Sequence, residues 1–280
     1  PIPNIVEEPQ ELVFGAYDPE GTLNDTTLSI EEVFLAWRLN DTSEITSALQ
    51  KIRQKERMPL ISLEPWSFNR NGMVKETLLT DIVEGKYDPT IQGICQTIGQ
   101  ENPQPVLLRW GQEMELTGQW EWAQGNPEGF IASYRKFVDV CRSTGATNIR
   151  FVWSPAGDPS LKKYWPGSAY FDYAGLTALE FEAWSLQKGA PRGLTFEELF
   201  DPRYNLVKDY GKPVIIAEFG ADREQQEEWL KEASLAFANY PLLKGVVLFN
   251  AKSETAWDGG LTPDWRINAP WDPNLETKTK

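Results

Sequence analysis

Eight short apolar runs alternate with amphipathic stretches along this chain, and this alternation limits its possible folds more than any other feature. The runs are rich in β-branched or aromatic residues, as expected of strands, and the stretches between them repeat apolar residues at helical spacing. The predicted strands are Leu12–Tyr17, Val33–Trp37, Leu60–Leu63, Val106–Trp110, Ile149–Trp153, Tyr173–Leu179, Val214–Glu218 and Gly245–Asn250. Strands that alternate with helices are typical of a parallel sheet.

The helical stretches carry their own boundary signals. Asn126 before Pro127 is a helix start, and Thr195 with Glu198 has the spacing of a capping box. A chain of 280 residues accommodates a barrel of about 250 residues, and no dinucleotide-binding glycine pattern favours an open sheet. We therefore predict the α/β class, with a single (β/α)8 TIM barrel as one catalytic domain over residues 1–280 and a frayed tail at 272–280.

Histidine is absent from the sequence, which excludes serine and cysteine hydrolases that use a histidine base and most zinc sites. Carboxylates are then the side chains best suited to acid–base chemistry. No clustered carboxylate motif suggests a metal site, so we expect neither a metal nor a cofactor.

The charge balance bears on partners. With 27 basic and 41 acidic residues the net charge is −14, which disfavours nucleic acid. No apolar run is long enough to span a membrane, and the start at Pro1 suggests that a signal peptide has been removed from a secreted or extracytoplasmic protein. We expect a monomer. Cys95 and Cys141 are expected to be core thiols rather than a disulfide, because neither has a CxxC partner.

Two glutamates end predicted strands at the edge where barrels place function. Glu113 follows the fourth strand and Glu218 ends the seventh. Period-two alternation places Glu218 on the face of Val214 and Ile216, and Glu113 on that of Arg109. If both faces point inward, two carboxylates meet at the barrel mouth, which is the arrangement that glycosidic cleavage requires.

Tryptophan is abundant, with twelve residues, and several lie near predicted strand ends, where aromatic rings could either bind sugar faces or fill the core. The substrate-binding candidates are Arg109, Gln112, Trp66, Trp110, Trp120, Trp153, Trp165 and Trp265. Glu64, beside Trp66, either adds a carboxylate to the cleft or pairs with an arginine.

An ordered set of motifs resembles glycoside hydrolase family 26. The set comprises RWGQEMELTGQWEW from Arg109, FVWSP, YWPG, AEFG from Ala217 and DWRI from Asp264. The resemblance runs from Phe14 to Ile267. It implies a (β/α)8 barrel and a retaining endo-acting enzyme on a β-linked polysaccharide such as β-1,4-mannan or β-1,3-1,4-glucan. Glu113 would be the acid/base, Glu218 the nucleophile, and Arg109 an arginine bound near the nucleophile.

Two positions depart from the family pattern. Gln112 replaces a histidine beside the acid, and Leu179 stands where a tyrosine usually orients the nucleophile. These departures leave open a non-catalytic sugar-binding or polysaccharide-synthesis accessory domain on the same barrel. A lyase or aldolase is disfavoured, because Lys252 is the only lysine placed suggestively and is more simply a solvated loop residue.

Overall fold

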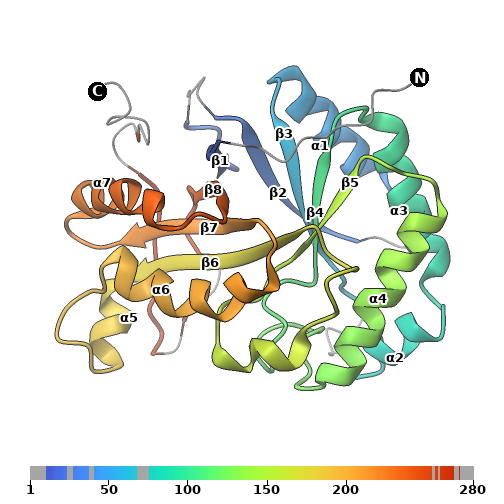
Figure 1. Cartoon of the computed structure of the whole chain (residues 1–280). Helices are drawn as coiled ribbons and strands as arrows, with labels where there is room; N and C mark the ends of the chain where they lie inside the picture. Colours follow the sequence, from blue (N-terminus) through green and yellow to red (C-terminus); the bar gives the residue numbers. More distant parts are fainter. Residues whose placement is uncertain are drawn as a thin grey trace.

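The structure, a computed structural model, describes residues 11–23, 28–37, 41–67, 76–253, 256–257, 259–267 and 271. The tail expected to fray, 272–280, lies outside these residues. The described part of the chain forms a closed barrel in which each strand pairs in parallel with the next and β8 pairs with β1 (Figure 1). The predicted (β/α)8 barrel is therefore confirmed.

All eight predicted strands are present. They are β1 (Val13–Tyr17), β2 (Ile30–Ala36), β3 (Met58–Glu64), β4 (Val106–Trp110), β5 (Ile149–Trp153), β6 (Tyr173–Phe181), β7 (Val214–Asp222) and β8 (Leu243–Phe249). The largest difference at a strand start is at β2, which begins three residues before the predicted Val33. Glu31 and Glu32 interrupted the apolar pattern there, although both belong to the strand.

Helices surround the barrel, with α3 and α4 on one side and α6 and α7 on the other (Figure 1). The α-helices are α1 (Ser43–Gln54), α2 (Leu78–Val83), α3 (Asp88–Glu101), α4 (Pro127–Ser143), α5 (Glu182–Gln187), α6 (Phe196–Val207) and α7 (Gln226–Ala236). Short 3-10 helices are η1 (Pro159–Tyr164), η2 (Lys208–Tyr210) and η3 (Phe237–Asn239).

The predicted helix starts are confirmed. The Asn126 side chain accepts a hydrogen bond from the Gly129 N–H at the start of α4, and Thr195 and Glu198 form a reciprocal capping box on α6. Each satisfies backbone N–H groups that the first turn of a helix leaves without partners. Helices with such defined starts help to fix where the strands that follow them join the barrel.

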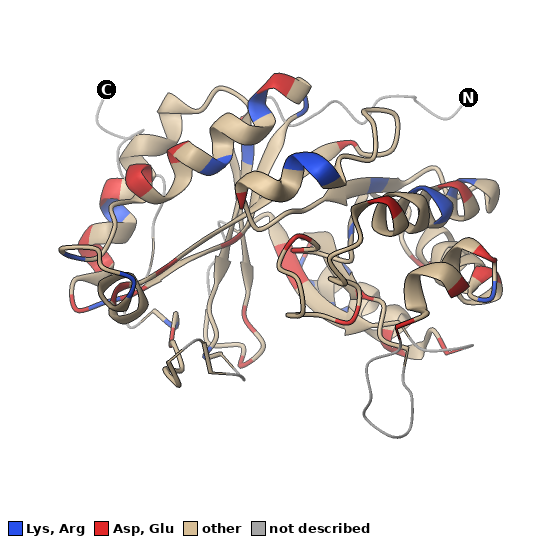
Figure 2. Cartoon of the chain, turned by 90° about the horizontal axis from the view of Figure 1, so that it is seen from below, with Lys and Arg blue, Asp and Glu red and all other residues tan. Residues whose placement is uncertain are grey.

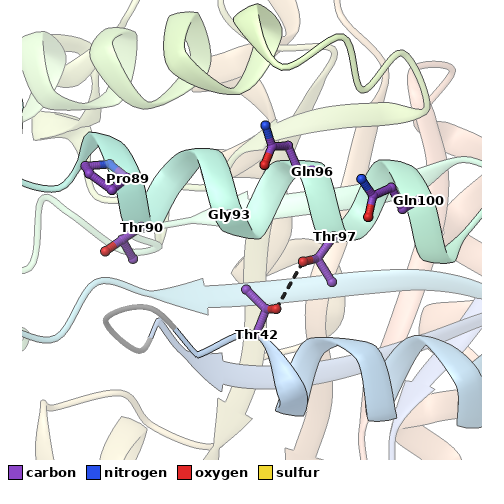
Figure 3. Close-up of a pocket in the computed structure, with 7 residues that line it drawn as sticks. All are labelled: Thr42, Pro89, Thr90, Gly93, Gln96, Thr97 and Gln100. Carbon is purple, nitrogen blue, oxygen red and sulfur yellow. Dashed lines mark hydrogen bonds between the residues drawn. The ribbon is translucent and has the colours of Figure 1, made fainter.

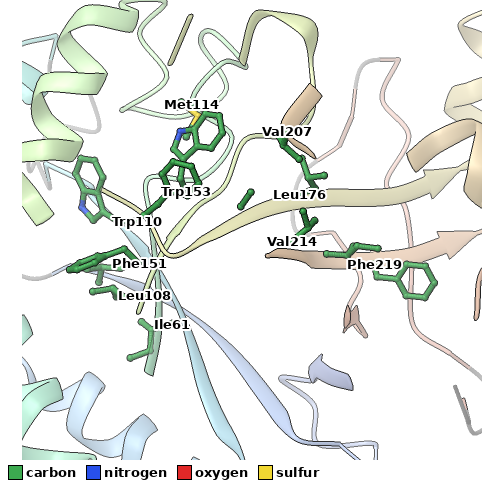
Figure 4. Close-up of a cluster of buried hydrophobic side chains, with 14 of the residues drawn as sticks. Ile61, Leu108, Trp110, Met114, Phe151, Trp153, Leu176, Val207, Val214 and Phe219 are labelled. Atoms are coloured by element: carbon green, nitrogen blue, oxygen red, sulfur yellow. The ribbon is translucent and has the colours of Figure 1, made fainter. Parts of the chain in front are cut away.

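The apolar core has two layers separated by the barrel wall. A small inner cluster fills the barrel. A larger outer cluster packs the strands against the helices, and Figure 4 shows part of it. The inner cluster contains Ile30, Leu60, Leu107, Val152, Tyr173, Ile215, Ala217 and Val247. Because side chains alternate along a strand, membership in this cluster identifies which neighbours also point inward.

The two cysteines correct one expectation. Cys95 of α3 and Cys141 of α4 form a disulfide, with their Cα atoms 5.3 Å apart, instead of remaining core thiols. Spacing in the sequence gave no sign of it, because the partners are 46 residues apart on separate helices. Helix packing brings the two Cα atoms within disulfide range.

Candidate active site

Arg109 is the cation at the centre of the barrel. It lies two residues beyond the inward-facing Leu107 on β4, and its side chain is 0% exposed. Its Nε donates to Ser154 Oγ at 2.8 Å, and its Nη1 donates to Ser62 Oγ at 3.2 Å. Its Nη2 lies 2.7 Å from Oε1 of Glu218. The guanidinium is thus held by neighbouring strands and forms an ion pair with the predicted nucleophile.

Glu218 reaches this position through a β-bulge. Ile216 and Glu218 pair with consecutive residues of β6, so Ala217 is the extra residue. The predicted alternation on β7 was wrong, because Val214 and Ile216 belong to the outer cluster whereas Ile215 and Ala217 belong to the inner one. The bulge reverses the alternation and turns Glu218 inward, which is a known role of bulges beside active sites.

Glu113 is held by contacts from three strands. The backbone turns at the end of β4, where Gly111 and Glu113 have φ values of 60° and 55°. The Glu113 N–H donates to the Ser154 carbonyl at 2.8 Å, just after β5. The Thr177 hydroxyl of β6 donates to Oε1 of Glu113 at 2.7 Å. The left-handed backbone at a glutamate is unusual and is typical of strain held at functional sites.

Glu218 is a buried carboxyl with other charged groups around it. Burial raises the pKa of Glu218, and Arg109 opposes this shift by favouring the ionised form. The negative charges of Glu113 and Glu64 raise the pKa of Glu218 further. Geometry agrees, because Thr177, which donates its hydroxyl to Glu113, is the β6 residue paired with Glu218 on β7. The two glutamates therefore lie on either side of one residue at the mouth of the barrel.

Gln112 and Glu64 form a hydrogen-bonded pair beside the acid. The Gln112 amide donates to Glu64 Oε1 at 3.0 Å, and Trp66 Nε1 donates to Glu64 Oε2 at 2.9 Å. Within the part of the chain that the structure describes, Glu64 therefore binds an amide and an indole, and no arginine pairs with it. Gln112 is buried whereas Glu64 is partly exposed, so Gln112 lies deeper in the protein than Glu64.

Trp66 and Trp120 have the exposure expected of rings that contact a ligand. Both are partly buried, their ring centroids lie 6.4 Å apart, and Trp120 stacks on Trp122. Trp265 is buried beside Gly220 near the ends of β7 and β8, and its ring contacts Phe249. These three rings lie around the end of the barrel that carries the glutamates.

Trp110 and Trp153 are corrected from substrate-binding candidates to core residues. Both are 0% exposed and belong to the outer cluster, as Figure 4 shows. Their neighbours Arg109 and Val152 point into the barrel, so alternation turns the two indoles outward toward the helices. Trp110 stacks on Phe137 of α4, at 5.0 Å between ring centroids.

Trp165 also lies away from the glutamates. Its ring is 40% exposed and stacks on Tyr210, whose ring in turn contacts the outward-facing Trp153. It therefore belongs to the outer wall, and its predicted place in the cleft is wrong.

Several polar residues at the site were missed in the sequence. The missed residues are partners of Arg109 and Glu113. Arg109 is contacted by Glu32, Ser62 and Ser154, and Glu113 is contacted by Thr177. Alternation from Leu60 and Val152 would have placed Ser62 and Ser154 inside the barrel, which was the available signal. Glu32 was missed because the predicted strand began after it.

Glu115 is a further buried carboxyl next to the acid. Its Oε1 accepts from the N–H groups of Gly157 and Asp158, at 3.0 and 3.3 Å. Burial raises the pKa of Glu115 to about 7, and the charge of Glu113 contributes to the same shift. The loop after β4 therefore carries a titratable group near neutral pH.

A separate hollow lies outside the barrel, between Thr42 and one face of α3 (Figure 3). Its volume is about 320 Å³, and its lining side chains are mostly threonine and glutamine. These lining residues include no ionisable group, so they offer no acid–base chemistry. Elsewhere, acidic and basic residues are interspersed along the outer helices and loops (Figure 2).

Within the residues that the structure describes, no helix has the length and apolar character needed to cross a bilayer. No group of three or more acidic, cysteine or histidine side chains in the same residues is arranged to hold a metal ion.

Comparisons with known proteins find a matching family model and a curated relative. Residues 83–188 match the family model described as Glycosyl hydrolase family 26, a segment that contains Glu113 but not Glu218. The chain is 27% identical over 269 residues to Endoglucanase H of Acetivibrio thermocellus, covering 88% of this chain but 27% of that protein. The chain thus spans about a quarter of that relative's length. These matches confirm the resemblance to the family.

Two solved structures show the same fold. A family 26 β-mannanase from Bacteroides ovatus has a TM-score of 0.61 at 14% identity, over 86% of this chain and 80% of that one. Cel5A of Thermotoga maritima, solved with mannotriose, has a TM-score of 0.60 at 12% identity, over 90% and 94% of the two chains. At such identities the likeness concerns the barrel alone.

Proposed function

We propose that this relative of glycosyl hydrolase family 26 is a retaining, endo-acting glycoside hydrolase that cleaves a β-linked polysaccharide. The observation that carries the proposal is the pair of carboxyls at the mouth of the barrel, each with its own partner. Glu218 forms an ion pair with Arg109, and Glu113 accepts a hydrogen bond from Thr177. Two carboxyl groups in different environments are what double displacement requires.

In this mechanism Glu218 attacks the anomeric carbon. Arg109, at 2.7 Å, favours the ionised carboxylate that a nucleophile needs. Glu113 gives its proton to the departing glycosidic oxygen and later takes a proton from the water that hydrolyses the glycosyl-enzyme. The hydroxyl of Thr177 helps to fix the Glu113 carboxyl for both steps.

The proposed substrate is β-1,4-mannan or β-1,3-1,4-glucan. Support comes from the relative named an endoglucanase and from the fold shared with a β-mannanase. Trp66 and Trp120, which are partly exposed, would stack on sugar rings, and Trp265, which is buried, would line the site without such a contact. Gln112 would act through Glu64 on sugar hydroxyls. No cofactor takes part in this scheme.

A non-catalytic sugar-binding domain is the second candidate. The specific observation that favours it is Gln112, whose amide binds Glu64 where the family usually places a histidine. Against it stands the contact of Arg109 with Glu218, because sugar binding alone does not require a buried cation beside a second carboxylate.

A reducing-end assay on β-mannan, lichenan, β-1,3-xylan, laminarin and carboxymethylcellulose tests both candidates. Hydrolysis of mannan or lichenan, with a rapid fall in viscosity, is the expected result for an endo-acting enzyme. Proton NMR of the first product should show the β-anomer, because double displacement retains configuration. Binding to these polymers without hydrolysis would favour the second candidate, and a first product in the α-form would exclude retention.

The biological setting is part of the proposal. We propose one catalytic domain over residues 1–280, acting as a monomer outside the cytoplasm. The disulfide between Cys95 and Cys141 supports an oxidising compartment, because such bonds are rare in reducing ones.

A further inference from the structure

Glu32 is a buried carboxyl in the barrel that the proposed mechanism does not use. It lies on β2, two residues beyond the inward-facing Ile30, and is 1% exposed. Its Oε1 accepts from the Ser62 hydroxyl at 2.6 Å and lies 3.4 Å from Nη1 of Arg109. Its Oε2 has no hydrogen-bond partner among the described residues. A charged oxygen without a donor is costly in such a place.

One guanidinium therefore faces two carboxyls. Arg109 contacts Glu32 from β2 and Glu218 from β7. If both were ionised, the buried group would carry a net negative charge, and Glu113 and Glu64 would add to the repulsion at Glu218. Burial raises the pKa of both Glu32 and Glu218, because the charged forms lose their contact with water, and the neighbouring carboxylates raise both values further. Glu32 and Glu218 together are consequently most stable when one of them is protonated and the other is ionised.

The contacts decide which carboxyl holds that proton. Glu218 lies 2.7 Å from the guanidinium and its side chain is 11% exposed, whereas Glu32 lies 3.4 Å away and its side chain is fully buried. The closer ion pair and the partial access to water both favour ionised Glu218. The proton then belongs on Glu32, where Oε2 has no donor to stabilise a charge.

We propose that Glu32 is a positioning residue that holds this proton in the free enzyme and releases it when Glu218 becomes a glycosyl ester. Esterification removes the charge of Glu218 and leaves Arg109 without an anionic partner. The Glu32 O–H then ionises, its proton passes to solvent, and the new carboxylate pairs with Arg109. Hydrolysis of the ester restores the Glu218 carboxylate, and Glu32 takes a proton back, so the full cycle consumes none. This inference rests on the proposed retaining mechanism.

Proton release on trapping of the ester tests the inference. The probes are 2-deoxy-2-fluoro-β-cellobiosyl and β-mannobiosyl fluorides, which lose fluoride without an acid and leave a slowly hydrolysed ester. The Glu113→Gln enzyme removes the proton of the acid/base from the count and keeps Glu32 and its surroundings intact. Mass spectrometry measures the adduct on Glu218, and a pH indicator in weak buffer measures protons released at a pH where the wild-type enzyme is active.

We expect about one proton per adduct from Glu113→Gln, and none from the matched double variant Glu32→Gln/Glu113→Gln. Because Glu32 is native in the first variant, the result does not depend on whether the double variant folds. Adduct formation without proton release from Glu113→Gln would overturn the role of Glu32. If the wild-type enzyme hydrolyses polysaccharide but neither probe forms an adduct on Glu218, the proposed nucleophile would instead be contradicted.

Discussion

Thr177 donates its hydroxyl hydrogen to Oε1 of Glu113 at 2.7 Å, which joins the strand β6 to the residue that follows β4. Replacing Thr177 by valine keeps the shape of the side chain and removes the donor. We expect kcat/KM on the polysaccharide to fall about 10- to 100-fold, because the hydroxyl stabilises the carboxylate that forms as Glu113 gives up its proton, and a hydrogen bond to a charged group contributes about 1.5 to 3 kcal/mol. Thr177→Ser keeps the hydroxyl and is the control. Equal activity of the valine and serine variants would show that this contact does not matter for catalysis.

Glu113→Ala should separate the acid role from the rest of the site. Hydrolysis of the polysaccharide should fall by at least about a hundredfold, because its leaving group must be protonated. An aryl glycoside with a good leaving group should be spared, and the basic limb of its pH profile should flatten. Azide should restore turnover by replacing the activated water. Equal loss on both substrates, without azide rescue, would remove Glu113 from the acid/base role.

Glu218→Ala should abolish hydrolysis and leave oligosaccharide binding nearly unchanged, because a nucleophile contributes covalent chemistry more than ground-state affinity. The fold should tolerate the change, since Glu32 can then ionise and become the anionic partner of Arg109. Isothermal titration with an oligosaccharide and a reducing-end assay measure the two quantities. Turnover at the wild-type rate would refute the assignment.

Glu115 should make stability depend on pH. Its pKa is raised from 4.5 to about 7 by burial, so the folded state binds the proton more tightly than the unfolded state. Its contribution is fully present below about pH 4.5 and is lost as pH rises through about 7. The free energy of unfolding should therefore fall by about 3 kcal/mol between pH 4 and 8, relative to Glu115→Gln. The variant keeps an oxygen for the Gly157 and Asp158 N–H groups. Parallel urea titrations from pH 4 to 8 that give the same slope for both proteins would contradict the expectation.

The disulfide should affect stability without affecting chemistry. Replacing Cys95 and Cys141 together by alanine should lower the free energy of unfolding by about 2 to 4 kcal/mol, because the unfolded chain gains freedom. The bond joins α3 to α4 outside the barrel, so kcat measured well below the melting temperature should not change. Reduction of the wild-type protein should reproduce the shift in Tm. A large loss of kcat in the folded variant would contradict this separation.

The sequence predicted the barrel well because alternating strands and helices carry a strong periodic signal. The position of Glu113 followed from the end of β4. Glu218 was placed inward for the wrong reason, because a bulge at Ala217 leaves no mark in an apolar run. Trp110 was misplaced although an inward Arg109 implies that its neighbour points outward, and Trp153 was misplaced because nothing in the sequence showed that Val152 points inward. The disulfide depended on how two distant helices pack, and Glu32 depended on a buried charge that interrupts the strand pattern, so local sequence indicated neither.

The left-handed backbone at Glu113 has a consequence for laboratory evolution. Glu113 and Glu56 are the two non-glycine residues with positive φ in the described part of the chain, and such a conformation costs about 1 kcal/mol or more that glycine would not pay. Glu56 follows α1 and takes no part in the site. A variant library sorted only for folded protein should therefore enrich glycine at both positions. At Glu56 the enrichment would be harmless, but at Glu113 the most stable members of the library would be those that have lost the proposed acid.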